Sequence, residues 1–414
     1  MERILHFPTF ILWSAGLLAS LAPAGAEESS PALTLDQVVA EIMATHPERA
    51  FYEAEIEAAQ AQRRVAATRD RPELSLEGGR LRAHDARGIV TGEGWSWSVS
   101  VAQTFEWPGR LALRKSIANR QLDLAELGFA RFQVALAARA RVLAYGLYAA
   151  AQKAAATREV AERYQALREG FVARDPAGLT PLLETRVIEA QELALKRRAA
   201  EASLAHQAAR VELNALRGGT LSAPLVITAP PLEFPDVIDP AALHAAARDR
   251  NFEYRIRQVE LAQQGLEVSL ARHERYPAFT LSPFYSREEA NERETTVGLG
   301  LSIPLPNPAR GRATVGMAEA RQRQAEAALL MAQRELERDV VLAHHDYVVQ
   351  VAEIRSWAPE AAEKFREAAA LADRHFRLGA VPIGTYVELQ EAYLDAIDAL
   401  LDLQLAALEA GARL

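Results

Sequence analysis

Histidine is the residue type in this chain best suited to binding a metal ion or moving a proton, and its only adjacent pair is His344 and His345. Neighbouring side chains on a helix point about 100° apart, whereas two ligands of one metal ion need a spacing of three or four residues. The sequence also lacks a Gly-rich phosphate loop, a His-Glu-x-x-His motif and a nucleophile elbow. We therefore expect no catalytic residue, metal or cofactor, and we look for the function in the architecture.

Charge and cysteine content narrow the class of protein further. The net charge is −8, from 47 basic and 55 acidic residues, which argues against binding nucleic acid through its phosphates. Cysteine is absent. This excludes disulfide bonds, thiolate metal ligands and a lipidated N-terminal cysteine.

The first 26 residues have the layout of a cleaved secretory signal. Arg3 precedes an apolar run from Phe10 to Leu21, and three small residues follow at 24–26. That run is too short to span a bilayer as a helix, which takes about 20 residues. No later stretch reaches this length without charges. The exported protein is therefore either soluble or crosses a membrane as β-strands, whose signal is weaker.

Distinctive landmarks recur about 200 residues apart in the same order, which indicates a duplicated unit. The landmarks are a strand that follows a proline, an alternating strand, a Gly-Arg pair and a Gly-x-x-Pro turn. They pair Pro72, Leu74 and Leu76 with Pro277, Phe279 and Leu281; Trp97, Val99 and Val101 with Leu299, Leu301 and Ile303; Gly109 and Arg110 with Gly311 and Arg312; and Gly178, Pro181 and Leu182 with Gly379, Pro382 and Ile383. We predict a first structural repeat over 27–217, a Pro-rich linker over 218–240 and a second repeat over 241–414.

Two segments, 95–105 and 296–305, alternate between apolar and small or polar residues, which predicts two-faced β-strands. With one strand before each, the chain has four strands of about 10 residues, the length of a tilted outer-membrane strand. Polar loops at 80–94 and 286–295 would connect them. The face expected to meet lipid comprises Trp95, Trp97, Val99, Val101, Val297, Leu299, Leu301 and Ile303, with Ser and Gly facing a lumen. A soluble β-hairpin would show the same alternation.

Long helices are predicted around these strands. One opens near Leu35 and ends near Arg69, with a break at Pro47; its counterpart runs from Asp239 to Glu274. Helices of about 65 residues, over 110–174 and 312–378, carry apolar residues every three or four positions and would be about 100 Å long. A turn then reverses each chain segment into a returning helix. The combined length of the opening and returning helices nearly equals the length of the long helix. The two shorter helices, placed end to end, could therefore pack along the whole of the long one.

The expected fold is therefore mainly α with a small β part, in which long antiparallel coiled-coil helices accompany four strands. Four strands cannot close a barrel, and open sheet edges are not tolerated in lipid. Three chains would supply twelve strands, between the eight that fill their own interior and the 16 to 18 of wide pores. The sequence thus predicts a homotrimer.

The opening run from Leu33 to Gln37 with His46-Pro47, the Gly109-Arg110 pair and the 377–380 sequence Arg-Leu-Gly-Ala together resemble the TolC-like outer-membrane factor family. The resemblance implies a trimeric twelve-stranded barrel in the outer membrane of a Gram-negative bacterium and a helical tunnel through the periplasm. It implies no enzymatic activity. Family members are exit ducts that dock on a periplasmic adaptor and serve, indirectly, an inner-membrane transporter of the RND or ABC type.

Site residues follow from this resemblance. The helix tips that would contact the adaptor are Gly178, Leu179, Pro181, Leu378, Gly379, Ala380 and Pro382. A plain helix-reversal turn also explains these glycines. Glu388 stands where the family carries an acid that narrows the periplasmic aperture, whereas Thr385 replaces a second acid.

Three functions stay open. The first is the duct of a tripartite efflux system, where short loops and a short chain are similar to the CzcC/CusC-like heavy-metal branch, although the acylation cysteine of its lipoprotein members is missing. The second is a type I protein-secretion duct of the same architecture. The third is a periplasmic coiled-coil scaffold or adaptor without a pore.

Overall fold

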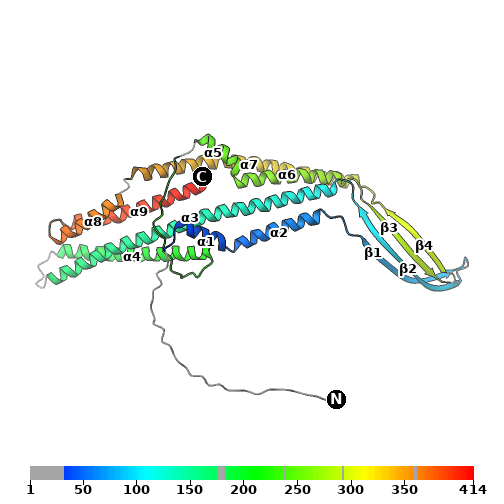
Figure 1. Ribbon diagram of the computed structural model, residues 1–414, viewed down its shortest axis with the longest axis horizontal. Helices are drawn as coiled ribbons and strands as arrows, with labels where there is room; N and C mark the ends of the chain where they lie inside the picture. Colours follow the sequence, from blue (N-terminus) through cyan, green and yellow to red (C-terminus); the bar gives the residue numbers. More distant parts are fainter. Residues whose placement is uncertain (1–31, 175–181, 237–238, 291–292, 358–360) are drawn as a thin grey trace, which may run out of the picture.

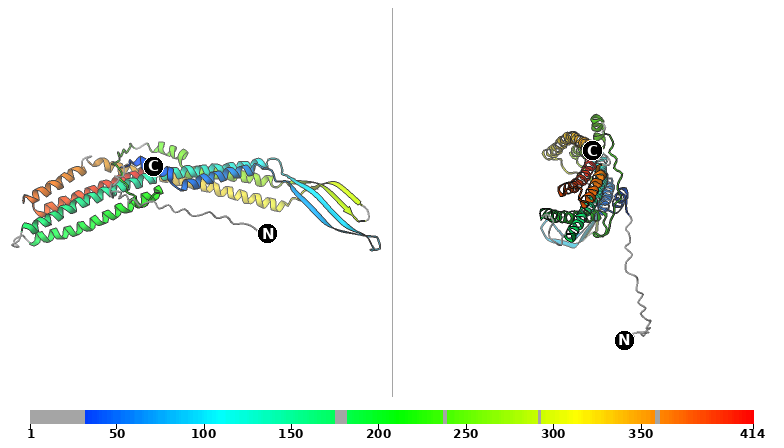
Figure 2. Two further views of the ribbon diagram at one scale, coloured as in Figure 1. Left: turned by 60° about the horizontal axis from the view of Figure 1, so that its bottom comes forward. Right: turned by 90° about the vertical axis from the view of Figure 1, so that its left-hand side faces the viewer.

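The computed structural model describes residues 32–174, 182–236, 239–290, 293–357 and 361–414. The predicted signal peptide and the predicted tip residues Gly178, Leu179 and Pro181 lie outside these ranges. The molecule is elongated, with a four-stranded sheet at one end and long helices running away from it (Figure 1). The three views agree on this rod-like shape (Figure 2).

The first half of the chain supplies six elements in the predicted order. Thr34 begins the first helix with a capping box, because its side chain accepts from the backbone of Gln37 while the Gln37 side chain accepts from Thr34. The break at Pro47 is present. The elements are α1 (Leu35–Thr45), α2 (Glu48–Ala66), β1 (Glu73–His84), β2 (Val90–Phe105), α3 (Arg110–Arg174) and α4 (Leu182–Arg217).

The second half repeats this order with one difference. Its elements are α5 (Pro240–Arg250), α6 (Phe252–His273), β3 (Phe279–Glu289), β4 (Arg293–Ser302), α7 (Pro308–Ser356), α8 (Ala361–Arg377) and α9 (Ile383–Arg413). The prediction of one uninterrupted helix over 312–378 is wrong. The helix begins four residues earlier, with Pro308 as a favoured first residue, and ends at Ser356, because the backbone of Trp357 is extended.

The long helix α3 is lined by shorter helices, as the lengths predicted. α2 packs on its sheet-proximal half and α4 on the remainder (Figure 1). In the second half α6 and α9 pack on α7, and α9 continues along α8. One stretch of α3, Arg110–Glu169, is long and apolar enough to cross a membrane when judged by length and composition alone. Its buried residues, among them Ala140, Ala144 and Leu147, form part of the helical core.

The Pro-rich segment 218–236 has no regular helix or strand but is held at several points. Its backbone pairs with residue Leu33 through an isolated parallel bridge to Ile227. The buried Asn214 side chain donates to the carbonyls of Leu221 and Ala223. Farther along, the Tyr347 hydroxyl donates to the carbonyl of Pro235, at 3.1 Å. The segment is therefore packed across the helices.

The strands form one antiparallel sheet in the order β1-β2-β3-β4, so β1 and β4 are its edges. β1 and β2 extend through most of the predicted loop 80–94, and β3 and β4 extend through most of 286–295. Those loop predictions are wrong because antiparallel pairing is made by the backbone and continues beyond the point where the side chains turn polar. At the helix end of the sheet, Arg110 donates to the carbonyls of His273 and Tyr276 and ties the two halves together.

Candidate functional site: a two-faced sheet and the helix tips

The strand register places most of the apolar residues of all four strands on one face. Residues paired across an antiparallel sheet share a face, so Leu76 lies beside Val99, Val99 beside Tyr285, and Tyr285 beside Val297. Every predicted lipid-facing residue within the strands belongs to this outward face, and Ile303 follows directly after β4. Leu299 and Val297 are 64% and 76% exposed. Such a continuous exposed apolar face marks a contact surface.

The opposite, inward face is small and polar. It consists mainly of serine, glycine, threonine and glutamate side chains, and Ser98 donates to Glu77 across the β1–β2 pair. Leu81 is one apolar exception, and the larger one is Phe284. Its ring occupies the space beside Gly298, where an added Cβ would meet it at 2.5 Å. The sheet thus separates an apolar from a hydrophilic side.

Aromatic residues bracket the apolar band at both ends. The distal belt comprises Trp95, Trp97 and Tyr285, with the rings of Trp97 and Tyr285 5.4 Å apart. A helix-proximal belt, which no local sequence pattern predicts, consists of stacked Phe105–Phe279 and Trp107–Tyr276 pairs. The ten residue-to-residue steps from Trp95 to Phe105 span about 33 Å along a strand, or about 25 Å at a tilt of about 40°. This is the height of an outer-membrane apolar band.

At the far end of the molecule, α8 and α9 meet in a tight reversal. Gly379 has a φ of +74°, and the amide of Ala380 donates to the carbonyl of His375 while that of Gly379 donates to Phe376. These bonds form a Schellman motif, for which glycine is the favoured residue. Leu378 is exposed, and Pro382 precedes α9 in extended conformation. The geometry of the turn therefore explains by itself why glycine occupies position 379.

The helices behind this tip enclose a tyrosine-rich core. Tyr164 of α3 and Tyr386 and Tyr393 of α9 are buried among apolar residues of α3, α4 and α8. The Tyr386 ring stacks on Phe376, with centroids 5.0 Å apart. Burial raises the pKa of the Tyr386 hydroxyl, with nearby Asp373 adding to the effect. No described residue makes a hydrogen bond to that hydroxyl.

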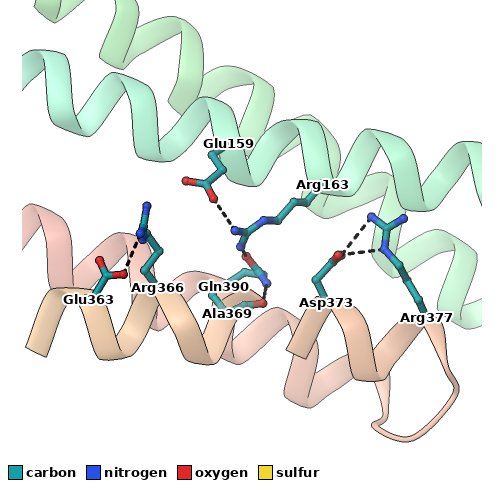
Figure 3. Close-up of polar contacts among 8 residues, drawn as sticks. All are labelled: Glu159, Arg163, Glu363, Arg366, Ala369, Asp373, Arg377 and Gln390. Atoms are coloured by element: carbon teal, nitrogen blue, oxygen red, sulfur yellow. Dashed lines mark hydrogen bonds and ion pairs between the residues drawn. The ribbon is translucent and has the colours of Figure 1, made fainter. Parts of the chain in front are cut away.

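A buried glutamine connects three helices next to this core (Figure 3). Gln390 of α9 is 1% exposed; its amide nitrogen donates to the carbonyl of Ala369 in α8 at 2.7 Å. Its amide oxygen accepts from Arg163 of α3 at 3.0 Å, and Arg163 is also paired with Glu159. A single side chain therefore fastens the α8–α9 hairpin to α3.

The predicted aperture acid lies on the other side of α9. Glu388 and Thr385 are exposed, while Tyr386 and Gln390 point into the core. Glu391 and Asp395 continue the exposed face at helical spacing. His344 and His345, in the middle of α7, are half-buried and exposed respectively. Among the described residues no group of three His, Asp or Glu side chains could hold a metal ion.

Residues 243–414 match the model of a family described as outer membrane efflux protein. This match covers less than half of the chain. The whole chain has the fold of TolC-like channels, so the resemblance found in the sequence is confirmed. No curated protein matches the chain significantly by sequence.

Three solved structures illustrate the likeness to this efflux-channel fold. A membrane protein from Pseudomonas aeruginosa is 20% identical, with a TM-score of 0.75 over 95% of this chain and 96% of that one. The Campylobacter jejuni CmeC outer membrane channel is 14% identical, with a TM-score of 0.73 over 98% and 93%. CusC, solved in a study of transmembrane channel formation, is 15% identical, with a TM-score of 0.71 over 92% and 90%. The fold of this chain is therefore shared with solved channel proteins.

Replacing Gln390 by leucine is expected to loosen the tip of this efflux-channel fold. The change removes the bonds to Ala369 and Arg163, and we expect a loss of about 1–3 kcal/mol, since one of them involves a charged donor. Hydrogen exchange should accelerate in α8 and α9 and stay constant in α5 and α6. The control is Gln165→Leu, which removes an exposed bond within α3 and should change stability by less than about 0.5 kcal/mol. Unchanged exchange in α8 and α9 would contradict the role assigned to Gln390.

The Tyr386→Phe variant is expected to be more stable than the wild type by about 1 kcal/mol, because it removes a buried hydroxyl that has no partner. The gain should increase above pH 10. In the unfolded chain Tyr386 ionises near the ordinary pKa of 10.0, whereas burial raises its pKa in the folded protein and keeps it protonated. Ionisation therefore stabilises the unfolded wild type as the pH rises above 10, and the free energy of unfolding falls. The phenylalanine variant has no such loss. Thermal midpoints at pH 8 and pH 11 measure both effects. Tyr276→Phe, at a half-exposed position, is the control, and a lower midpoint for Tyr386→Phe at pH 8 would refute the prediction.

Proposed function

We propose that this protein is a passive outer-membrane duct of a tripartite efflux system in a Gram-negative bacterium. The observation that supports this most strongly is the register of the sheet. Four strands turn a continuous apolar face one way and a hydrophilic face the other, and aromatic belts bound the apolar band. A soluble sheet could bury such a face against its own helices. Here Val297, Leu299 and Leu301 stay largely exposed.

The proposed assembly is a homotrimer. β1 and β4 are sheet edges with unpaired backbone groups, and lipid does not tolerate such edges. Pairing β4 of one chain with β1 of the next closes a twelve-stranded barrel when three chains take part. The helices of the three chains would then continue the barrel as a tunnel through the periplasm, with the inward face of the sheet lining the lumen.

The helix tips are the proposed contact with a periplasmic adaptor, through Leu378, Gly379, Ala380 and Pro382 and, in the other hairpin, Gly178, Leu179 and Pro181. Their support is the position of the α8–α9 reversal at the end farthest from the sheet (Figure 1). Glu388, exposed near this end, is the proposed aperture acid. Energy for transport would come from an inner-membrane transporter of the RND type, and heavy-metal ions or small toxic compounds are the proposed cargo.

Conductance of the purified protein in a planar bilayer is the decisive test. A duct gives discrete channels, and the protein stays in membranes after a carbonate wash. Release by carbonate as a monomer, without channels, would refute the proposal and favour a periplasmic scaffold. Cargo is tested by deleting the gene: sensitivity to metal ions or toxic compounds supports efflux, whereas loss of one secreted protein with unchanged sensitivity would favour a type I secretion duct.

A further inference from the structure

The sheet separates its charged residues between its two faces. All four arginines of the strands lie in outward register, together with two glutamates, Glu93 and Glu289. The inward face of the same strands carries four glutamates and no arginine or lysine. The outward arginines are Arg80, Arg82, Arg287 and Arg293; the inward glutamates are Glu73, Glu77, Glu288 and Glu294. The outward face therefore holds a net positive charge of two.

These arginines occupy three neighbouring levels at the distal end of the sheet. Arg80 pairs with Trp95, and Arg287 pairs with Trp97, so both lie at the distal aromatic belt. Arg293 pairs with Glu289, which pairs with Trp95, so it lies at the same belt. Arg82 lies one step farther from the helices on the same face. Tryptophan belts mark the boundary between hydrocarbon and headgroups, which is also where lipid phosphates lie. We call this set the arginine row.

The arginine row keeps hydrogen-bond donors available. The Arg80 guanidinium lies over the Trp95 ring, 5.6 Å from its centroid. Arg287 and Arg293 both pair with the same oxygen of Glu289, at 2.5 and 2.8 Å. The side chains of Arg82 and Arg293 are about two-thirds exposed. A guanidinium offers five donors in a planar fork, so one carboxylate leaves several free for phosphate.

We infer that the arginine row binds the phosphate groups of outer-leaflet lipid headgroups. The inference rests on the proposed function, because it requires the outward face to meet lipid. A phosphorylated lipid would make two contacts with this surface. Its acyl chains lie along the apolar band that includes Leu76 and Val99, and its phosphates reach the arginines at the distal end of that band. A free phosphate ion would gain the second contact alone, at exposed guanidiniums that glutamates partly neutralise.

The test is native mass spectrometry of the purified mature protein in detergent, titrated with lipid A and, separately, with lipid A stripped of its phosphates. We expect the wild type to bind the phosphorylated form at least about tenfold more tightly, given the attraction of several arginines for phosphate. The combined Arg80→Gln, Arg82→Gln, Arg287→Gln and Arg293→Gln variant should lose this preference. Millimolar inorganic phosphate should not displace the lipid. Equal binding of the two lipids, an unchanged preference in the variant, or displacement by inorganic phosphate would each overturn the inference.

A second pair of variants works in the opposite direction. Glu93→Gln with Glu289→Gln frees the outward arginines and should tighten binding of lipid A several-fold. Glu77→Gln with Glu294→Gln makes the same charge change on the inward face and should leave binding unchanged. Equal effects of the two pairs would overturn the inference. Bilayer conductance of the same preparations separates the two proposals: channels without phosphate preference refute the arginine row alone, whereas absence of channels in the wild type refutes the duct.

Discussion

Placing an arginine at Leu299 is expected to prevent assembly of the protein in the membrane. Leu299 lies in the middle of the outward face, opposite Pro283 and between Val297 and Leu301. A charged side chain at the bilayer midplane costs about 2–4 kcal/mol in a membrane strand. In a trimer the cost would be incurred three times, about 6–12 kcal/mol in all. We expect loss of heat-resistant trimers and of protein from the outer-membrane fraction.

Ser100→Arg is the matched control. Ser100 pairs with Phe284, the neighbour of Pro283, so it lies at the same level of the sheet but on the inward face. The same side chain there should reach water in the lumen, permit assembly and reduce the cation conductance of the channel. Equal assembly of the two variants, or a greater loss for Ser100→Arg, would show that the two faces have been assigned the wrong way round.

Gly94→Ala is expected to disrupt the distal half of the sheet. A Cβ added to Gly94 would lie 1.4 Å from the carbonyl oxygen of Glu289 and 2.5 Å from its carbonyl carbon. Both atoms belong to the backbone, so β2 and β3 would have to separate. We expect a cost above about 3 kcal/mol, the upper range for overpacking. Heat resistance of the proposed trimer and strand content measured by circular dichroism should both fall.

Gly78→Ala is the comparison, because the nearest atom to a Cβ at Gly78 is 3.9 Å away. Alanine restricts the unfolded chain more than glycine does, so this variant should be as stable as the wild type or slightly more stable. If Gly94→Ala and Gly78→Ala were equally stable, the close approach of β2 and β3 at Gly94 would be refuted. Both variants keep the charge and polarity of the sheet unchanged, so steric contact is the variable tested.

The sequence by itself determined the classes of elements and their order. Alternation at 95–105 and 296–305 predicted strands because side chains on a strand point to opposite faces in turn. The three- to four-residue spacing in α3 and α7 predicted packed helices for the same geometric reason. The lengths of α2 and α4, compared with the length of α3, predicted that the two shorter helices pack along the long one. These features depend on neighbours within a few residues, and such local patterns survive in the sequence.

The tertiary structure decided what depends on partners far along the chain. Register set the common outward face and brought Arg287 to the level of Trp97, although about 190 residues separate them. The proximal belt needed Trp107 and Tyr276 to meet across the two halves. In the sequence Gln390 does not differ from other polar residues of a helix, and only the packing of α3 and α8 around it shows that it is a buried connector. The free energy of pairing between distant segments depends on both partners, so it cannot be read from either segment alone. A periodic pattern therefore shows which face of a segment is apolar, but not which segment packs beside it.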